Sequence, residues 1–167
     1  MKKIRLLLIA CCVLALVGCG KQMTNSNQQE IVSAKKKILN KGKKIKMTNL
    51  KIIVNGKTLK AQLNSTAAAK DFKKELPKTL TFTSFMSNPE KMADLHHALS
   101  LKGMPKGDEG KAGEIGYWSP DRRIIFYYGY VDYYPGIHII GKFTTKDYHK
   151  VVSKMKDNTK VKIELAK

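Results

Sequence analysis

Between residues 48 and 167 the sequence alternates apolar and polar positions over many short segments, a pattern typical of half-buried β-strands. The first two segments are 51–54 and 57–63. They are joined by Asn55-Gly56, a dipeptide that tolerates the two positive φ angles of a type I′ turn. Apolar side chains occupy one face of the second segment (Leu59, Ala61 and Leu63). The pattern therefore predicts a β-hairpin.

Two other segments repeat apolar residues every three or four positions, as an amphipathic helix does. The first, 67–76, follows three cap-type residues and ends before Pro77. Its buried stripe is expected to be Ala68, Phe72 and Leu76. The second is expected to begin with Thr144 and Asp147, which are spaced like a capping box, and to continue to about residue 154.

Further strands are predicted where short apolar or alternating runs recur, at 79–83, 114–118, 122–128, 137–143 and 161–165. Residues 86–111 show no clear period, and we predict mostly loop there, with one helical turn around 92–99. Many short strands with two isolated helices indicate a mainly β protein. We expect residues 48–167 to form one domain, a closed antiparallel β-barrel whose ends the two helices cap.

The N-terminal residues have the layout of a secretory signal. Three cations (Lys2, Lys3 and Arg5) precede an apolar run that is too short to span a bilayer as a helix. Residues 16–19, Leu-Val-Gly-Cys, resemble the lipobox of bacterial lipoproteins. The resemblance implies a signal peptide over 1–18, cleavage before Cys19, and attachment of diacylglycerol to that cysteine. The alternative is a simple secretory signal that happens to contain cysteine.

The cysteine content agrees with the lipoprotein interpretation. The chain has three cysteines, and Cys11 and Cys12 lie within the predicted signal. The mature protein would keep Cys19 alone, which leaves no disulfide and no thiolate metal site. Two acyl chains would hold the protein on a membrane nearly irreversibly. We therefore expect a lipid-anchored protein on the extracytoplasmic face of the cell membrane.

Residues 19–47 are too polar to build a core, and we predict a disordered, lysine-rich tether there. This segment carries eight lysines against one acid, and residues 48–167 carry 21 Lys and Arg against 12 Asp and Glu. A lipoprotein outside the cell meets little nucleic acid, so the expected counterions of the tether are anionic lipid headgroups or acidic wall polymers. Solvation of an exposed linker explains the same lysines equally well.

Several segments resemble the cyclophilin-like domains of bacterial proteins of unassigned function. They are the Asn-Gly hairpin, the helix with its preceding cap residues, the run Glu75-Leu76-Pro77, and the strand pair 113–120 and 124–129. Residues 136–143 also resemble the late strand and glycine of true cyclophilins. The resemblance covers nearly all of 48–167 and implies an eight-stranded antiparallel barrel with a helix at each end.

The same resemblance argues against prolyl isomerisation. True cyclophilins use a strand-borne Phe-His-Arg motif, whose arginine polarises the amide that precedes proline. The corresponding strand here, 80–85, has aromatic residues but no His-Arg pair. The two arginines of the domain, Arg122 and Arg123, follow a turn elsewhere in the sequence. Loss of such a donor removes much of the stabilisation of a twisted amide.

Aromatic residues gather in one part of the sequence, where eight of the thirteen fall between Tyr117 and Tyr134. On paired strands about half of such residues face the core. The others, in a loop that contains Gly and Pro, can stack on a peptide, a sugar ring or a quaternary ammonium group. His138 is favoured as a hydrogen-bonded strand residue rather than a base. The candidate ligand-binding residues are Phe82, Trp118, Phe126, Tyr128, Tyr130, Tyr133, Tyr134 and His138.

The sequence carries no signature of another chemistry. Its four histidines lack the spacing of a metal site with acid partners. Residues 136–142 approach a phosphate-binding loop, but Phe143 stands where Ser or Thr is needed. There is no nucleophile elbow and no zinc-protease motif. We therefore expect no metal, no cofactor and no catalytic residue.

Three functional hypotheses follow. The first is a lipid-anchored, non-catalytic binding protein whose barrel holds a peptide or small ligand. The second is a divergent peptidyl-prolyl isomerase that acts on secreted proteins and uses Arg122 or Arg123 as its donor. The third is structural, with the basic tether binding anionic wall polymer.

Substitution of Cys19 tests the predicted anchor. Cys19→Ser should abolish incorporation of a labelled fatty acid in a bacterial host and release the protein from the membrane fraction, because serine offers no thioether. Cys12→Ser lies in the predicted signal and should leave labelling unchanged. Fatty-acid label on Cys19→Ser in a gel assay would contradict the prediction.

Overall fold

The computed structural model describes residues 47–167. The signal peptide predicted for 1–18 and the lipidated tether predicted for 19–47, apart from Met47, lie outside the described residues. In the described part of the chain, no helix has the length and apolarity needed to cross a membrane.

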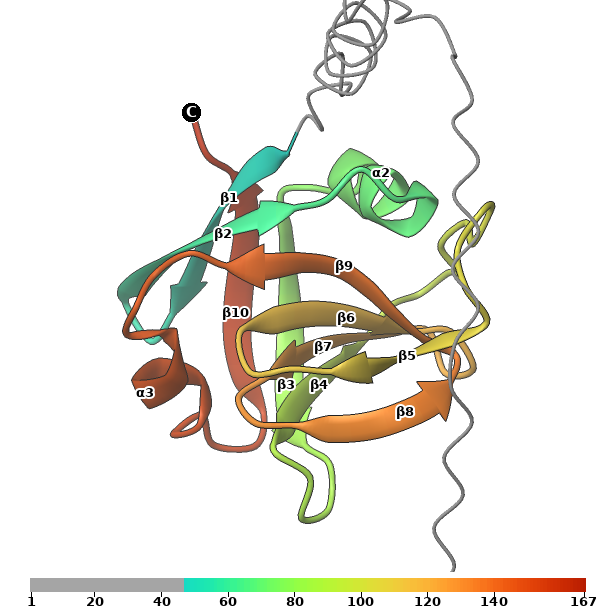
Figure 1. The fold of residues 1–167 in the computed structure, drawn as a ribbon. Coiled ribbons are helices and arrows are strands. Elements are labelled where there is room, and N and C mark those ends of the chain that lie inside the picture. Colours follow the sequence, from blue (N-terminus) through green and yellow to red (C-terminus); the bar gives the residue numbers. More distant parts are fainter. Residues whose placement is uncertain (1–46) are drawn as a thin grey trace, which may run out of the picture. The chain divides into compact units, whose positions relative to one another are not determined.

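Eight strands form one closed antiparallel barrel (Figure 1). Around the ring their order is β1-β10-β3-β4-β7-β6-β9-β2. Their bounds are β1 Thr48–Val54, β2 Lys57–Leu63, β3 Lys78–Ser84, β4 Glu90–Asp94, β6 Glu114–Trp118, β7 Arg123–Tyr127, β9 Ile137–Phe143 and β10 Thr159–Leu165. The predicted mainly β, closed barrel of eight strands is confirmed. The predicted turn is also confirmed, since Asn55 and Gly56 have φ angles of 48° and 77°.

Helix α2, Ala67–Lys74, packs against β2 and β9. Its N-terminus is capped by Thr66, whose hydroxyl oxygen accepts a hydrogen bond from the Ala69 N–H at 3.3 Å. Ala68 and Phe72 are buried in the core and Leu76 packs against it, so the predicted stripe is confirmed. The helix therefore closes one end of the barrel with its apolar face.

Helix α3, Tyr148–Val152, is shorter than predicted. It begins after Asp147, whose side chain makes no capping hydrogen bond, so the capping box expected at Thr144 is wrong. The chain is held at this point by Thr145, whose Oγ1 accepts a hydrogen bond from the backbone N–H of Lys60 at 2.6 Å. Tertiary hydrogen bonds to β2 thus take the place of a local cap.

Residues 86–111 contain two strands that the sequence pattern does not predict. β4 pairs with β3 on one side and β7 on the other, so the helical turn expected around 92–99 is wrong. β5, Gly107–Gly110, pairs with β8, Val131–Pro135, in a separate two-stranded sheet. The sequence of β5 is Gly-Asp-Glu-Gly and has no apolar side chain. Such segments become strands through the partners that they meet rather than through their own propensity.

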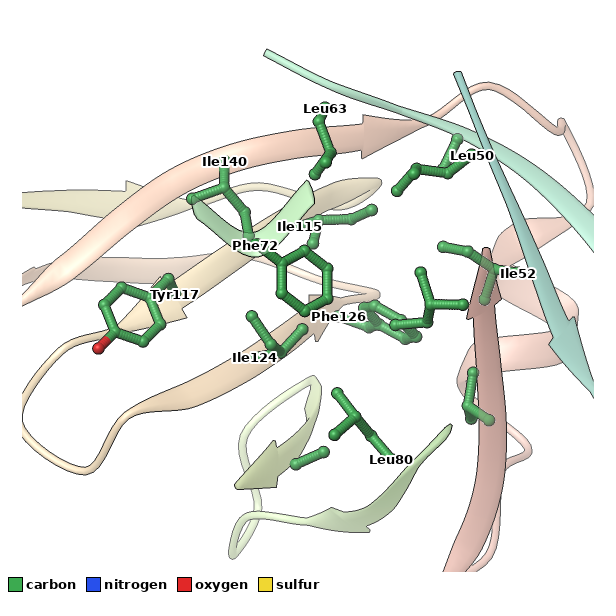
Figure 2. Packing of buried hydrophobic residues seen from close by; sticks show 14 of the residues in the cluster. Leu50, Ile52, Leu63, Phe72, Leu80, Ile115, Tyr117, Ile124, Phe126 and Ile140 are labelled. Carbon is green, nitrogen blue, oxygen red and sulfur yellow. The ribbon is translucent and has the colours of Figure 1, made fainter. Parts of the chain in front are cut away.

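The barrel interior is filled by one continuous apolar cluster (Figure 2). Phe72 enters it from α2, and Phe82 and Phe126 stack with their ring centroids 4.3 Å apart. Phe143 meets Phe126 edge-on at 5.0 Å. Inward positions recur at every second residue of a strand, so the register of the ring decides which residues are buried.

The ring closes where β2 meets β9. Leu63 lies opposite Gly141 in this ladder. A Cβ atom at Gly141 would collide with the backbone oxygen of Gln62, so the close approach of the two strands requires glycine. The register of β9 against β6 also shifts near this point, as at a β-bulge. Gly141 therefore lets β9 bend between its two neighbours.

Gly141→Ala should destabilise the barrel by about 1–3 kcal/mol, because the added methyl group forces two backbones apart. The measurement is the free energy of unfolding in urea. Lys142→Ala, at the next and exposed position of β9, should change that free energy by less than about 0.5 kcal/mol. Equal stability of Gly141→Ala and the unsubstituted protein would show that closure tolerates a side chain here.

Candidate functional site

The outer wall of the barrel carries a second apolar cluster, separate from the core. Along β7, Ile124 and Phe126 point into the barrel, whereas Ile125 and Tyr127 point outward. Ile125 and Tyr127 join Met92 of β4 and Ile137 of β9, and all four are almost fully buried. An outward-facing apolar surface stays buried when something covers it, and here the cover is the two-stranded sheet.

The β5–β8 sheet lies against this wall through close contacts at Tyr127. Val131 of β8 packs on the outer cluster. The Tyr127 ring lies between Gly110 of β5 and Gly116 of β6, where a Cβ atom would collide with ring atoms. In Figure 1 the two short strands are seen beside β6 and β7. The glycines at 110 and 116 thus serve close packing around one aromatic ring.

A groove remains between the wall and β8, with a volume of about 420 Å³. Its floor is apolar, and Tyr130, Tyr133 and Tyr134 stand at its mouth with 56%, 60% and 58% of their surface exposed. The complete lining is Phe85, Asn88, Glu90, Met92, Trp118, Ile125, Tyr130, Val131, Asp132, Tyr133, Tyr134 and Ile137. A concave apolar site of this size with a few polar groups is typical of small-ligand pockets.

Glu90 is the most deeply buried polar residue of the groove, with 4% of its surface exposed. Burial raises the pKa of its carboxyl group, and a hydrogen bond from the Asn88 amide to Oε1 at 3.4 Å lowers it less. Within residues 47–167, no cation lies at ion-pair distance from Glu90. The groove therefore holds a carboxylate that the surrounding protein does not neutralise.

Trp118, the single tryptophan of the chain, forms one wall of the groove. Its ring centroid lies 6.4 Å from that of Phe85 and 6.5 Å from that of Tyr134. Its indole N–H is buried and has no hydrogen-bond partner among the described residues. A buried donor without an acceptor is costly, and a ligand oxygen would supply the missing bond.

Arg123 stands at the edge of the groove. Its guanidinium carbon lies 5.7 Å from the centre of the Trp118 ring, and its Nη1 lies 3.3 Å from the sulfur of Met92. Two carboxylates hold the guanidinium there: Asp94 Oδ1 lies 2.8 Å from its Nε, and Asp121 Oδ2 lies 3.2 Å from its Nη1. Arg122 points elsewhere, toward the carbonyl oxygen of His96 at 3.5 Å.

Comparison with known proteins identifies the family to which this fold belongs. The sequence profile of the cyclophilin-like family matches residues 52–164. The chain belongs to the cyclophilin-like family. Its fold is similar to the solution structure of a hypothetical protein from Archaeoglobus fulgidus, with a TM-score of 0.55, 15% identity, and coverage of 75% of this chain and 99% of the archaeal chain. No curated protein matches the sequence.

Four of the eight predicted ligand-binding residues line the groove of the cyclophilin-like barrel: Trp118, Tyr130, Tyr133 and Tyr134. Phe82 and Phe126 are 0% exposed and belong to the core. Tyr128 is half-buried outside the groove lining, although its hydroxyl donates to the carbonyl oxygen of Asn88 at 3.3 Å. Ligand binding by these residues stays a prediction, and the groove brings half of them together.

His138 lies apart from the groove, 2% exposed, on the inner side of β9. Its Nε2 is 3.2 Å from Ser119 Oγ, and burial lowers the pKa of its imidazole. Ser119 Oγ donates in turn to the carbonyl oxygen of Gly136 at 3.3 Å. The geometry is that of a hydrogen-bonded histidine at the end of the barrel.

Sequence reasoning missed several groove residues. Glu90 falls in a segment expected to be loop, and Met92 at the start of the helical turn expected there. Asp132 lies among the loop tyrosines, but only aromatic residues of that loop were taken as candidates. The sequence of β4, Glu-Lys-Met-Ala-Asp, does not alternate apolar and polar residues and so carries no pattern that indicates a strand. The segment is also too short to be recognised without the strands on either side.

We also considered two alternative kinds of functional site within residues 47–167. No group of three or more metal-ligating side chains is found in this part of the chain. A second hollow of about 490 Å³ lies beside α2, next to Lys70, Lys74 and Lys102. Lys74 is already paired with Asp71 at 2.7 Å, and the surroundings are polar and exposed. We therefore take the groove under β8 as the candidate functional site.

The Glu90 carboxyl should make stability fall as pH rises. The folded state holds its proton more tightly than the unfolded chain, because burial raises the pKa above the ordinary 4.5. Its contribution is therefore full below about pH 4.5 and is lost as the pH rises through the raised pKa. Glu90→Gln, which stays neutral, should remove this decline in urea unfolding followed by Trp118 fluorescence.

Glu164 provides a control, because the pKa of its carboxyl group is shifted in the opposite direction to that of Glu90. Lys162 and Lys51 lower the pKa of its carboxyl, so its contribution is present above the ordinary 4.5 and is lost as the pH falls. Glu164→Gln should therefore flatten the pH dependence of stability on the acid side, below about pH 4.5, and leave the slope of the profile at neutral pH unchanged. An identical pH profile for Glu90→Gln and the unsubstituted protein would contradict the expectation for Glu90.

Proposed function

We propose that this protein is a lipid-anchored, extracytoplasmic binding protein whose cyclophilin-like domain binds a peptide or small ligand without catalysis. The groove under β8 is the observation that carries the proposal. It combines a buried apolar floor, three exposed tyrosines at its mouth and a buried indole donor that has no partner within residues 47–167. Aromatic rings supply a large contact area at low entropic cost, and the free N–H supplies direction.

The dimensions of the groove suit a short ligand. About 420 Å³ falls within the usual range for small-molecule sites and accommodates a few side chains of a peptide. A peptide carbonyl group would satisfy the Trp118 N–H, while its side chains would cover Met92 and Ile125. The ligand-binding surface is thus the outside of the barrel wall, because the interior is filled by the core.

The absence of catalysis is proposed from the strand that corresponds to the catalytic strand of true cyclophilins. In residues 80–85 of this chain, Phe82 points into the core and no arginine is present. An amide bound in the groove would therefore lack the donor that true cyclophilins place on this strand. The anchor and the location are proposed from the lipobox-like residues that end at Cys19.

The second candidate function, a divergent prolyl isomerase, is favoured by the position of Arg123. Its guanidinium lies at the edge of the groove beside Met92 and Trp118, which is where a polarising donor would be needed. Of the two arginines weighed from the sequence, Arg123 is the better placed. Against this role, Asp94 and Asp121 already engage its Nε and Nη1.

Exchange NMR on a short Xaa-Pro peptide mixed with residues 20–167 separates the two functions. Binding without catalysis should shift the Trp118 indole and tyrosine signals and leave the cis–trans exchange rate of the peptide unchanged. Trp118→Ala should weaken binding at least about tenfold, because it removes a wall of the groove. Leu165→Ala, an exposed apolar residue on β10 outside the groove lining, serves as the matched control.

If the protein accelerates cis–trans exchange and Arg123→Ala abolishes the acceleration, the isomerase hypothesis would be supported and binding without catalysis would be contradicted. Full peptide binding by both Trp118→Ala and Tyr133→Ala would show that the ligand binds elsewhere.

A further inference from the structure

The groove is acidic, although the domain around it is basic. Residues 48–167 carry 21 Lys and Arg against 12 Asp and Glu. The twelve residues that line the groove include two carboxylates, Glu90 and Asp132, and no lysine or arginine. A pocket that lacks the commonest charge of its own domain is complementary to a cation rather than to an anion.

The Glu90 charge has no counterion in the part of the chain that the structure describes. Its neighbour in sequence, Lys91, points to the opposite face of β4, where its Nζ donates to Ser84 Oγ at 2.8 Å. The bond from Asn88 to Glu90 is long, at 3.4 Å. A carboxylate that is almost fully buried pays a desolvation cost, which a bound cation would offset.

The negative field extends beneath the floor of the groove. Burial raises the pKa of the Tyr127 hydroxyl, and the carboxylates of Glu90, Glu114 and Asp108 raise it further. The Tyr127 hydroxyl lies in the outer cluster and has no hydrogen-bond partner among the described residues. Three carboxylates thus act on one point of the barrel wall next to the groove.

Arg123, the cation at the edge, does not cancel this field. Asp94 and Asp121 together outweigh its single charge. Its position over Trp118 shows that a face of this ring accepts a cation at 5.7 Å. The rim is therefore neutral to negative, as the lining is.

The aromatic rings complete a cation site. Phe85 and Tyr134 both lie near Trp118 in the lining of the groove, and Tyr133 is exposed at the mouth. We infer that the groove binds an organic cation, a primary or quaternary ammonium group on an apolar stem. The ammonium group lies against Glu90 and Asp132, and the stem lies against the aromatic rings and Met92. This inference rests on the proposed function and names the chemistry of its ligand.

Titration with matched probes tests the charge. Choline is compared with its neutral isostere, in which carbon replaces the ammonium nitrogen, and the readout is the fluorescence of Trp118 together with its indole NMR signal. The full chain should bind choline at least about tenfold more tightly than the isostere. A short lysine peptide and its Nζ-acetylated form give the same comparison for a primary ammonium group. Whichever charged probe binds more tightly, choline or the lysine peptide, indicates whether the ligand carries a quaternary or a primary ammonium group.

Charge-removing substitutions locate the site. Glu90→Gln and Asp132→Asn keep the side-chain shape and should each weaken binding of the cationic probe by about three- to tenfold. Asp132 is exposed, so its variant remains folded even if Glu90→Gln disturbs packing. Asp147→Asn, exposed at the start of α3 and without a side-chain capping bond, removes the same charge elsewhere and should leave affinity unchanged.

Equal affinity for the charged and neutral members of both pairs would overturn the cation inference and leave the groove as a neutral ligand site. Equal losses in Asp132→Asn and Asp147→Asn would also overturn it, since the effect would then come from net charge alone. If the groove binds a peptide and Trp118→Ala abolishes that binding, the proposed function is still supported. The cation inference and the proposed function can therefore be contradicted independently.

Discussion

Closure of the eight-stranded ring is the constraint on which the rest of this structure depends. Each barrel strand is paired on both sides, and no barrel strand is left as an open edge. The ring closes where Gly141 allows β9 to lie directly against the backbone of β2 at Gln62. Once the ring is closed, its register decides which residue of every strand points inward and which points outward.

The groove is a consequence of that register. Because Phe126 faces the core, Ile125 and Tyr127 on either side of it must face outward. Outward apolar residues need a cover, and the short β5–β8 sheet covers most of them while leaving the groove beside Trp118. Gly110 and Gly116 let this cover approach the Tyr127 ring closely. The site is thus built from residues that packing alone would place on the wall.

The groove differs in charge from the domain around it. Lysines dominate the domain, and many acids outside the groove are already paired, as Glu164 is with Lys51 and Lys162. Glu90 differs because it is buried and has no ion-pair partner in residues 47–167. A buried carboxylate beside aromatic rings suits the cationic ligand that we propose, since the same burial that weakens its ionisation strengthens its attraction for a cation.

From the amino-acid sequence alone, a mainly β barrel, the Asn55-Gly56 turn, helix α2 and the tyrosine-rich character of one region could be predicted, because local period, turn chemistry and composition indicate them. The folded structure shows that Glu90–Asp94 and Gly107–Gly110 are strands, because both are shaped by partners distant in sequence. It also separated Trp118, in the groove, from Phe82 and Phe126, in the core. The side on which a strand residue points is set by the register of the whole ring, and no local pattern contains that register.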